Sequence, residues 1–418
     1  MKKIVLKNAK LIDGTGKEPI LGVSLVIEQG RIKEIFLDGA HNYGNDADII
    51  DCKGQTLLPG LIDAHMHTGA VDTNLSEQQR KNFPSMLVIK GVKILENTLE
   101  QGFTTGRDAG GVDPGFREAI KQKLINGPRL FVSGACLSQT GGHGDVRLPT
   151  ELDDYPKYTT GYVNRICDGI DEVRKETREQ IRQGVDQIKV YVSGGAATTE
   201  ELETSQFSLE ELKIIVFEAE AADKYVMAHC YSNKGARLCA KAGIRSIEHG
   251  NLLNRESIKI LKEKGIYLVP TLAIFEMLYR KGKELGIPDY FQKKANYLRE
   301  KSLEALDIAN QEGIKIASGS DLISSFQCYK GLELELKSKV LGTMGAIVAS
   351  TKTNAELLRQ EKDLGTIEEG KLADLILING NPLKDISLIQ DYKKNITLII
   401  KEGQIYKNII EPDKTLDS

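Results

Sequence analysis

The sequence has 418 residues, of which 40% are hydrophobic and 28% are charged, and its formal net charge is −3 at pH 7. This is the balance of an ordinary globular protein, and it does not indicate a surface for nucleic acids or other polyanions. The start carries two lysines but no apolar core of a signal peptide, and no apolar run approaches the roughly 20 residues that span a bilayer. Six cysteines without paired spacing favour reduced thiols, so we expect a cytoplasmic protein that binds neither membranes nor nucleic acids.

The two ends of the chain predict short strands joined by tight turns. Glycine-containing turns at Asp13-Gly14 and Gln29-Gly30-Arg31 separate the first strands, and a helix over Thr343–Gln360 precedes the last ones. We expect the two ends to pair, with residues 1–60 and 361–418 forming one small β-sandwich domain and a polar, disordered tail at Glu411–Ser418. The expected strands are Lys3–Ala9, Val23–Glu28, Ile32–Leu37, Leu375–Ile378, Ile396–Lys401 and Gln404–Tyr406.

Between the two ends, short apolar strands alternate with amphipathic helices. Eight such alternations are typical of a parallel (β/α)8 barrel, so the predicted fold class is α/β with a TIM-like barrel over residues 61–360. The predicted strands are Leu61–Ala64, Thr104–Arg107, Arg129–Ser133, Gln187–Val192, Tyr225–His229, Ser246–His249, Tyr267–Pro270 and Lys315–Ser318. The predicted helices are Phe83–Gln101, Ile170–Gly184, Ser208–Asp223, Lys234–Ala242, Asn254–Lys264 and Tyr290–Glu312.

Four of the six histidines fall at the C-terminal ends of predicted strands, where a barrel places its active site. His65 and His67 follow the first strand, and residues i and i+2 of an extended chain face the same side, so two imidazoles can reach one cation. His229 and His249 end the fifth and sixth strands. Each histidine alone is more often structural, but two at consecutive strand ends favour a pair of metal ligands.

An aspartate and a lysine complete this set. Asp321 closes the eighth strand and is predicted to be a metal ligand and the general base that takes a proton from the attacking water. The alternative for Asp321 is an N-cap for the next helix. Lys189 lies among apolar residues of the fourth strand, so it must pair, reach solvent or be modified. A buried ion pair is one interpretation, and carboxylation by carbon dioxide, which would let Lys189 bridge two cations, is the other.

These residues in this order resemble the amidohydrolase superfamily. Two further stretches support the resemblance: Leu58–Asp63 before the histidine pair, and Gly365–Asp374 near the end. The resemblance implies a barrel with two divalent metals, favouring zinc, held by His65, His67, His229, His249, Asp321 and a carboxylated Lys189. Ser320 stands where threonine is usual and Cys230 where alanine is common, but neither difference removes a ligand.

A narrower resemblance comes from Leu137–Asp145, Asp186–Lys189 and Ser246–Leu252. These stretches look like the branch of prolidases or Xaa-Pro dipeptidases, with related arginine or lysine carboxypeptidases and imidazolonepropionase-like proteins. The branch implies hydrolysis of dipeptides and N-acyl amino acids. The resemblance to the branch does not fix the side chain of the substrate.

Two side chains are predicted to act on the substrate beside the metals. His143 lies in a glycine-rich loop after the third strand and could reach a substrate carboxylate or the scissile carbonyl. Tyr231 lies two residues beyond His229, so its hydroxyl points into the site if the strand persists. The alternatives are an incidental histidine in a turn and a packed aromatic ring. Ala196–Gln206 is a candidate lid, and Ala273–Ile287 is a candidate specificity loop.

The sequence therefore predicts a metal-dependent hydrolase that cleaves the amide bond of a small dipeptide-like substrate with a metal-activated hydroxide. The expected substrates are Xaa-Pro, Xaa-hydrophobic or Xaa-Arg/Lys dipeptides or N-acyl amino acids, and homo-oligomers are compatible with the sequence. A cyclic-amide hydrolase or deaminase of the imidazolonepropionase type, using one metal, is the alternative. A non-catalytic barrel scaffold ranks third, because the full set of metal-ligand residue types is present.

Overall fold

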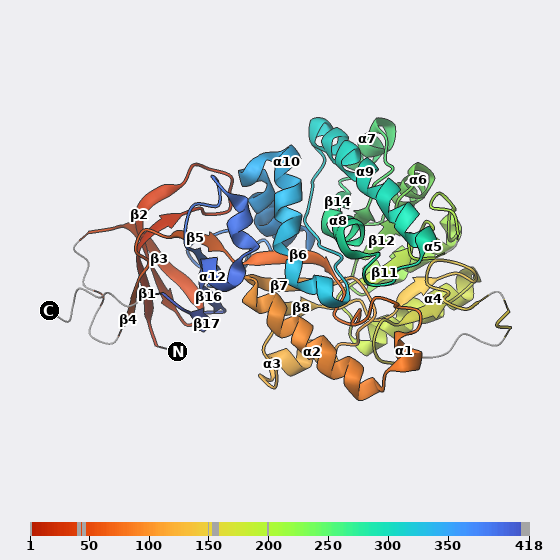
Figure 1. Cartoon of the computed structure of the whole chain (residues 1–418), viewed down its shortest axis with the longest axis horizontal. Coiled ribbons are helices and arrows are strands. Elements are labelled where there is room, and N and C mark those ends of the chain that lie inside the picture. The colour runs from red at the N-terminus through yellow and green to blue at the C-terminus, as the bar shows by residue number, and fades with distance from the viewer. Residues whose placement is uncertain are drawn as a thin grey trace.

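The chain forms an α/β fold in which a mainly antiparallel sheet lies beside a region of parallel strands and helices (Figure 1). The computed structural model describes residues 2–39, 43, 47–148, 150–152, 159–198 and 200–410. The predicted disorder of Glu411–Ser418 lies outside these residues.

The first sheet contains strands from both ends of the chain, in the order β17-β16-β15-β5-β1-β2-β3, with β4 pairing with β1. The C-terminal β15 pairs antiparallel with the N-terminal β5, which is the pairing of the two ends that the sequence predicts. The strands form a single sheet, so the sandwich stays a prediction. Their bounds are β1 Ile4–Leu11, β2 Ile20–Glu28, β3 Arg31–Leu37, β4 Asp48–Asp51, β5 Thr56–Pro59, β15 Leu375–Ile378, β16 Ile396–Lys401 and β17 Gln404–Asn408.

Strand β15 shows how this sheet is anchored to the rest of the molecule. Its sequence is Leu-Ile-Leu-Ile, and successive side chains point to opposite faces. Leu375 and Leu377 join the hydrophobic cluster of the terminal strands, whereas Ile376 and Ile378 join a cluster that includes Phe103 of the parallel region. Burial on both faces explains a continuous apolar run in place of an alternating one.

The parallel strands form two sheets, in the orders β6-β7-β8 and β10-β9-β11-β12-β13-β14. Seven of these strands correspond to predicted ones, but β8 is shorter than the predicted Arg129–Ser133, and β9 and β10 were not predicted. Each of these three strands has only three residues, too few to show a periodic pattern. The bounds are β6 Leu61–Met66, β7 Phe103–Asp108, β8 Arg129–Phe131, β9 Cys136–Ser138, β10 Asn164–Ile166, β11 Ile188–Tyr191, β12 Val226–Cys230, β13 Ser246–His249 and β14 Tyr267–Val269.

The predicted eighth strand, Lys315–Ser318, is reduced to one parallel bridge between Ile316 and Leu268 of β14. A buried side chain takes the place of part of the ladder. Asn354 Nδ2 donates to the carbonyl of Ser318 (2.8 Å), and its Oδ1 accepts from the Ser318 N–H (2.9 Å). The Ser318 carbonyl also accepts from the N–H of Ala64 in β6 (2.8 Å), so this segment contacts both β14 and β6.

The six predicted helices are present, and their ends differ from the predicted ones by two residues at most. Ser208 caps α5 through a capping box with Glu211, as a Ser-x-x-Glu pattern allows. The predicted loop conformation of Ala273–Ile287 is wrong, because most of this segment is helix α8, and its role in specificity stays a prediction. The helices are α1 Gln78–Lys81, α2 Pro84–Glu100, α3 Gly115–Lys121, α4 Gly169–Gln183, α5 Leu209–Ala221, α6 Asn233–Ala242, α7 Arg255–Glu263, α8 Leu272–Lys281, α9 Asp289–Glu312, α10 Gly331–Val348, α11 Asn354–Leu357 and α12 Tyr392–Asn395.

The predicted helix Thr343–Gln360 corresponds to the end of α10, a π-helical turn over Ala349–Thr353, and α11. Within the described ranges, no helix is both long and apolar enough to cross a membrane. All six cysteines are free thiols, and five of them are buried.

Candidate metal centre

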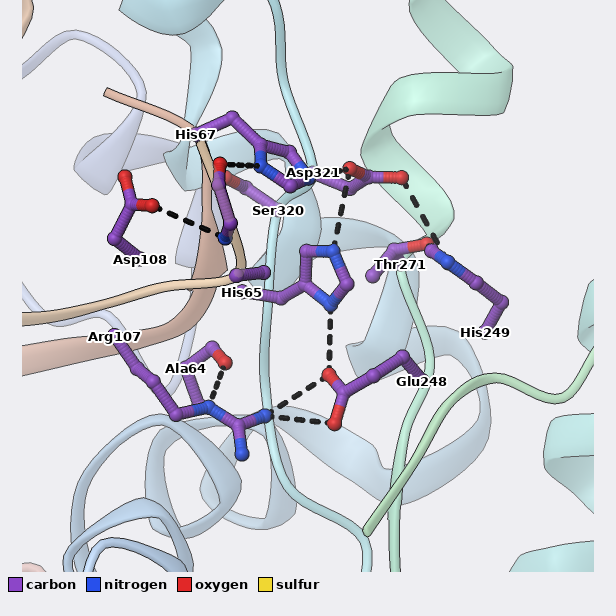
Figure 2. Close-up of polar contacts among 12 residues, drawn as sticks. Ala64, His65, His67, Arg107, Asp108, Glu248, His249, Thr271, Ser320 and Asp321 are labelled. Atoms are coloured by element: carbon purple, nitrogen blue, oxygen red, sulfur yellow. Dashed lines mark hydrogen bonds and ion pairs between the residues drawn. The ribbon is translucent and has the colours of Figure 1, made fainter. Parts of the chain in front are cut away.

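The end of strand β6 brings His65 and His67 to Asp321 (Figure 2). Oδ1 of Asp321 lies 3.1 Å from Nε2 of His67 and 3.4 Å from Nε2 of His65. One ligand atom from each of the three residues lies within 4.8 Å of the others. Burial would raise the pKa of the Asp321 carboxyl, but the neighbouring histidines outweigh it and hold that pKa well below its usual range. Asp321 is therefore a carboxylate, suited to a cation.

The hydrogen bonds of these histidines fit a metal site. Nδ1 of His65 lies 2.7 Å from Oε2 of Glu248, and Nδ1 of His67 lies 3.1 Å from the carbonyl of Gly110. Nε2 of His65 is buried and, apart from its 3.4 Å ion-pair distance to Oδ1 of Asp321, has no polar partner among the described residues. Metal-binding histidines typically donate one ring N–H to a carboxylate or carbonyl and present the other nitrogen to the metal. The nitrogen and oxygen donors around Asp321 therefore fit a divalent cation.

His229 and His249 lie at the ends of the neighbouring parallel strands β12 and β13, where the register pairs Cys230 with His249. Their ring centroids are 4.6 Å apart, and the His249 ring lies 5.0 Å from that of His65. Nε2 of His229 lies 3.1 Å from the Gly194 carbonyl. Burial lowers the pKa of both imidazoles well below the usual value, which favours the neutral form that binds metals.

Lys189 in β11 is almost completely buried, with an exposed fraction of 1%. Within the described residues its ammonium makes no direct ion pair or hydrogen bond, although the charges of Glu248 and Asp321 attract it. Burial lowers the pKa of Lys189, although Glu248 opposes that effect. A lysine that is buried, unpaired and shifted towards the neutral amine is the form that can react with carbon dioxide.

Two of the candidate ligands have strained backbones. The φ angles of His249 and Asp321 are 74° and 55°, in the left-handed region that non-glycine residues rarely adopt. Such strain is concentrated at functional sites, where the surrounding structure holds it in place. The alternative role of Asp321 as an N-cap is wrong, because the next helical turn begins after Ile323 and has no side-chain cap.

The structure places both predicted substrate-binding residues beside His229. The His143 ring stacks on the His229 ring with centroids 4.6 Å apart, and Nδ1 of His143 lies 2.6 Å from Oγ1 of Thr198. Tyr231 is buried, and its ring centroid lies 4.7 Å from that of His229 and 5.1 Å from that of His249. The roles of His143 and Tyr231 stay predictions.

A buried ion pair supports His65 and was not predicted from the sequence. Glu248 accepts from Nδ1 of His65, and Nη2 of Arg107 lies 2.9 Å from each oxygen of the same carboxylate (Figure 2). Both charged side chains are fully buried. Burial would raise the pKa of Glu248, but Arg107 and His65 outweigh it and lower that pKa to about 2. The sequence signal was a charged residue inside each of two apolar strands.

A second buried carboxylate, Asp63, joins β6 to the segment that carries Asp321. Its Oδ1 accepts from the N–H groups of His65 (3.2 Å) and Ser320 (3.0 Å). Its Oδ2 accepts from the Ser320 hydroxyl (2.6 Å) and from Nζ of Lys330 (2.8 Å). Asp63 therefore fixes the backbone of the two segments that bring His65 and Asp321 together.

Gly195 makes a testable contact with His143. A Cβ at position 195 would lie 1.8 Å from Cε1 and 2.0 Å from Nδ1 of the His143 ring, so either the ring or the loop must move. We expect Gly195→Ala to lower kcat/KM by about 100-fold, since small misplacements of a positioning group have effects of that order. Kinetics on a cleaved dipeptide measure this, with Gly39→Ala as control because a Cβ there meets nothing. Unchanged kinetics would contradict a role for His143 in this position.

Comparisons with known proteins identify the family of the chain. The Amidohydrolase family model matches residues 56–406, most of the chain. The chain therefore belongs to the amidohydrolase family, whose members hydrolyse carbon–nitrogen bonds, and the resemblance read from the sequence is confirmed.

Particular relatives are similar over nearly their whole length. An ochratoxinase of Aspergillus niger is 32% identical, over 97% of this chain and 87% of the relative. A crystal structure of a prolidase in complex with N-methylphosphonate-L-proline is 36% identical, with a TM-score of 0.94 and coverage of 97% of this chain and 100% of that one. A Xaa-Pro dipeptidase with methionine bound in its active site is 31% identical, with a TM-score of 0.88 and coverage of 97% and 100%.

Proposed function

We propose that this protein is a metal-dependent hydrolase that cleaves the amide bond of dipeptides or N-acyl amino acids. The convergence of four histidines and Asp321 at one buried site carries the proposal. The side chains of these histidines, His65, His67, His229 and His249, meet there from the ends of three strands. The similarity to a prolidase and to a Xaa-Pro dipeptidase supports a dipeptide-like substrate. Candidate residues at the C-terminal side of the amide are proline, a hydrophobic residue, arginine or lysine.

Two divalent cations, with zinc favoured, are part of the proposal. His65, His67 and Asp321 would hold one, His229 and His249 would hold the other, and Lys189, carboxylated on Nζ, would bridge them. The lack of any described partner for the buried Lys189 supports this modification, in which the neutral amine adds to carbon dioxide and releases a proton. Bound cations of this kind lower the pKa of water and polarise a carbonyl.

The side chains then divide the reaction among them. Asp321 takes the proton of the attacking water and delivers it to the leaving nitrogen, because it is an ionised carboxylate beside His65 and His67 with 17% side-chain exposure. Tyr231, buried against His229 and His249, donates a hydrogen bond from its hydroxyl to the oxygen of the scissile carbonyl. His143, stacked on the His229 ring, binds the substrate carboxylate.

The proposal extends to the architecture. The segment around Ile316 contacts both β14 and β6, and the N–H of Asp186 before β11 donates to the carbonyl of Val132 after β8 (2.8 Å). These contacts across both gaps between the parallel sheets support one closed (β/α)8 barrel. We assign residues 61–360 to the barrel, and residues 1–60 and 361–418 to a second, composite domain.

Metal content per chain, measured by mass spectrometry together with turnover of Xaa-Pro, Xaa-Leu and Xaa-Arg dipeptides, tests the proposal. We expect two metals per chain and cleavage of at least one dipeptide. Chelator-treated protein reloaded with zinc in the presence and absence of bicarbonate is the control for Lys189, since only bicarbonate should restore the second metal. One metal and no cleavage would refute the dipeptidase proposal in favour of ring-opening or deamination, and no metal would favour a scaffold.

A further inference from the structure

The described residues 194–198 and 200–206, called here the β11–α5 loop, connect the candidate metal centre to the outer helix α9. On its inner side, the Gly194 carbonyl accepts from Nε2 of His229, and Oγ1 of Thr198 lies 2.6 Å from Nδ1 of His143. Glu200 supports both contacts, since its Oε1 accepts from the Thr198 hydroxyl (2.6 Å) and from the Gly195 N–H (3.0 Å). The inner side of this loop therefore sets the position of the His143 ring.

On its outer side, a single ammonium holds the same loop. Nζ of Lys294, in the second turn of α9, donates to the carbonyls of Gly195 (3.4 Å), Thr198 (2.9 Å) and Glu200. An ammonium has three N–H donors, so three carbonyls from one loop satisfy all of them. One turn earlier on the helix, the hydroxyl of Tyr290 donates to the Ala197 carbonyl (3.1 Å). Lys294 therefore binds the loop and does not extend into solvent.

Polar bonds hold this side of the loop, beside the buried side chains of Ala196 and Leu202. A cavity of about 720 Å³ lies between α9 and the residues that follow Glu200, and Glu201, Leu202 and Glu203 line it together with Lys293 and Lys294. Glu201 and Glu203 are exposed beside this cavity, and exposed loop residues have few neighbours that oppose their displacement. Without the ammonium, the carbonyls of Gly195, Thr198 and Glu200 would lose their common donor.

We infer that Lys294 is a positioning residue, which holds the β11–α5 loop in the form that presents Thr198 to His143. Through this loop, an ammonium on an outer helix sets the substrate-binding geometry beside His229. The inference rests on the proposed function, in which His143 binds the substrate carboxylate. Because such a contact is made equally in the ground state and the transition state, its loss raises KM and leaves kcat largely unchanged.

The test compares Lys294→Met with Lys293→Met. Methionine keeps a straight apolar chain but has no donor, and Lys293 is the next residue on the same helix, with an exposed side chain that makes no contact with these carbonyls. We expect Lys294→Met to raise KM about tenfold with kcat and metal content unchanged. Peptides of the β11–α5 loop should exchange their amide hydrogens about tenfold faster in this variant. Lys293→Met should match the unaltered protein in every measurement.

Two results would overturn the inference. Unchanged amide exchange in Lys294→Met would show that the ammonium does not hold the loop. Faster exchange with an unchanged KM would show that the loop does not set substrate binding. Failure of the proposed function is distinguishable, because it appears as absence of turnover in the unaltered protein, while the exchange comparison requires no turnover. Lys294→Arg keeps a charged donor, so we expect the amide hydrogens of its β11–α5 loop to exchange faster than in the unaltered protein and more slowly than in Lys294→Met.

Discussion

Replacement of Asp321 by asparagine is expected to reduce kcat by about 10³-fold, within the range that general acid–base catalysis contributes. Asparagine has the same shape, and it tolerates the left-handed φ of 55° at this position. The backbone bond from the Asp321 N–H to the His65 carbonyl (2.8 Å) does not involve the side chain. The amide, however, cannot accept a proton from water. Kinetics on a cleaved dipeptide, together with the melting temperature, measure both effects.

Asp307→Asn is the matched control for this substitution. Asp307 lies on the exposed side of α9, where, within the described part of the chain, its carboxylate accepts a hydrogen bond from Gln311 alone (2.7 Å). We expect this variant to retain full activity and an unchanged melting temperature. Near-normal turnover in Asp321→Asn would contradict the assignment of Asp321 as the base, whereas a large fall in melting temperature would indicate a structural cause for lost activity.

The residues that meet at the candidate metal centre could be predicted because their signals are local. His65 and His67 follow an apolar strand with the i, i+2 spacing that puts both rings on one side, and His229 and His249 end two further strands. Parallel strands align such ends at one edge of the sheet, so proximity follows from topology alone. Tyr231 was placed by the same parity argument, and the structure puts its ring beside both histidines.

The features that the sequence does not predict correctly depend on contacts between residues far apart in the chain. The segment Lys315–Ser318 has the composition of a strand, but the side chain of Asn354, which is 36 positions away, bonds the Ser318 peptide and leaves one bridge. Likewise, Arg107 and Glu248 are separated by 141 positions, and neither has a local pattern that names the other. A charged residue inside an apolar strand indicates a buried group that needs a partner or a modification, and Lys189, Arg107 and Glu248 all carry this signal, but the signal does not identify the partner.

Replacement of Glu248 by glutamine is expected to weaken metal binding and destabilise the fold together. Nδ1 of His65 loses its anionic acceptor, and loss of such an outer contact typically lowers metal affinity about 10–100-fold. Arg107 becomes a buried charge without a carboxylate, and breaking a buried pair costs about 3–5 kcal/mol of unfolding free energy. Competition with a chelating dye measures the affinity, and denaturant unfolding of the metal-free protein measures the stability.

The pH dependence and a double variant separate these two effects. The pKa of Glu248 falls from its ordinary 4.5 to about 2 in the fold, so its stabilisation is complete above the unfolded pKa and is lost as the pH falls from about 4.5 towards about 2. The stability difference between the unaltered protein and Glu248→Gln should shrink over that range. Arg107→Met combined with Glu248→Gln removes the unpaired charge, so we expect it to recover stability relative to Glu248→Gln alone. Metal affinity should stay low in the double variant, because His65 still lacks its carboxylate acceptor. Recovery of metal affinity in the double variant would contradict this explanation. It would mean that the unpaired arginine, and not the lost orientation of His65, weakens metal binding.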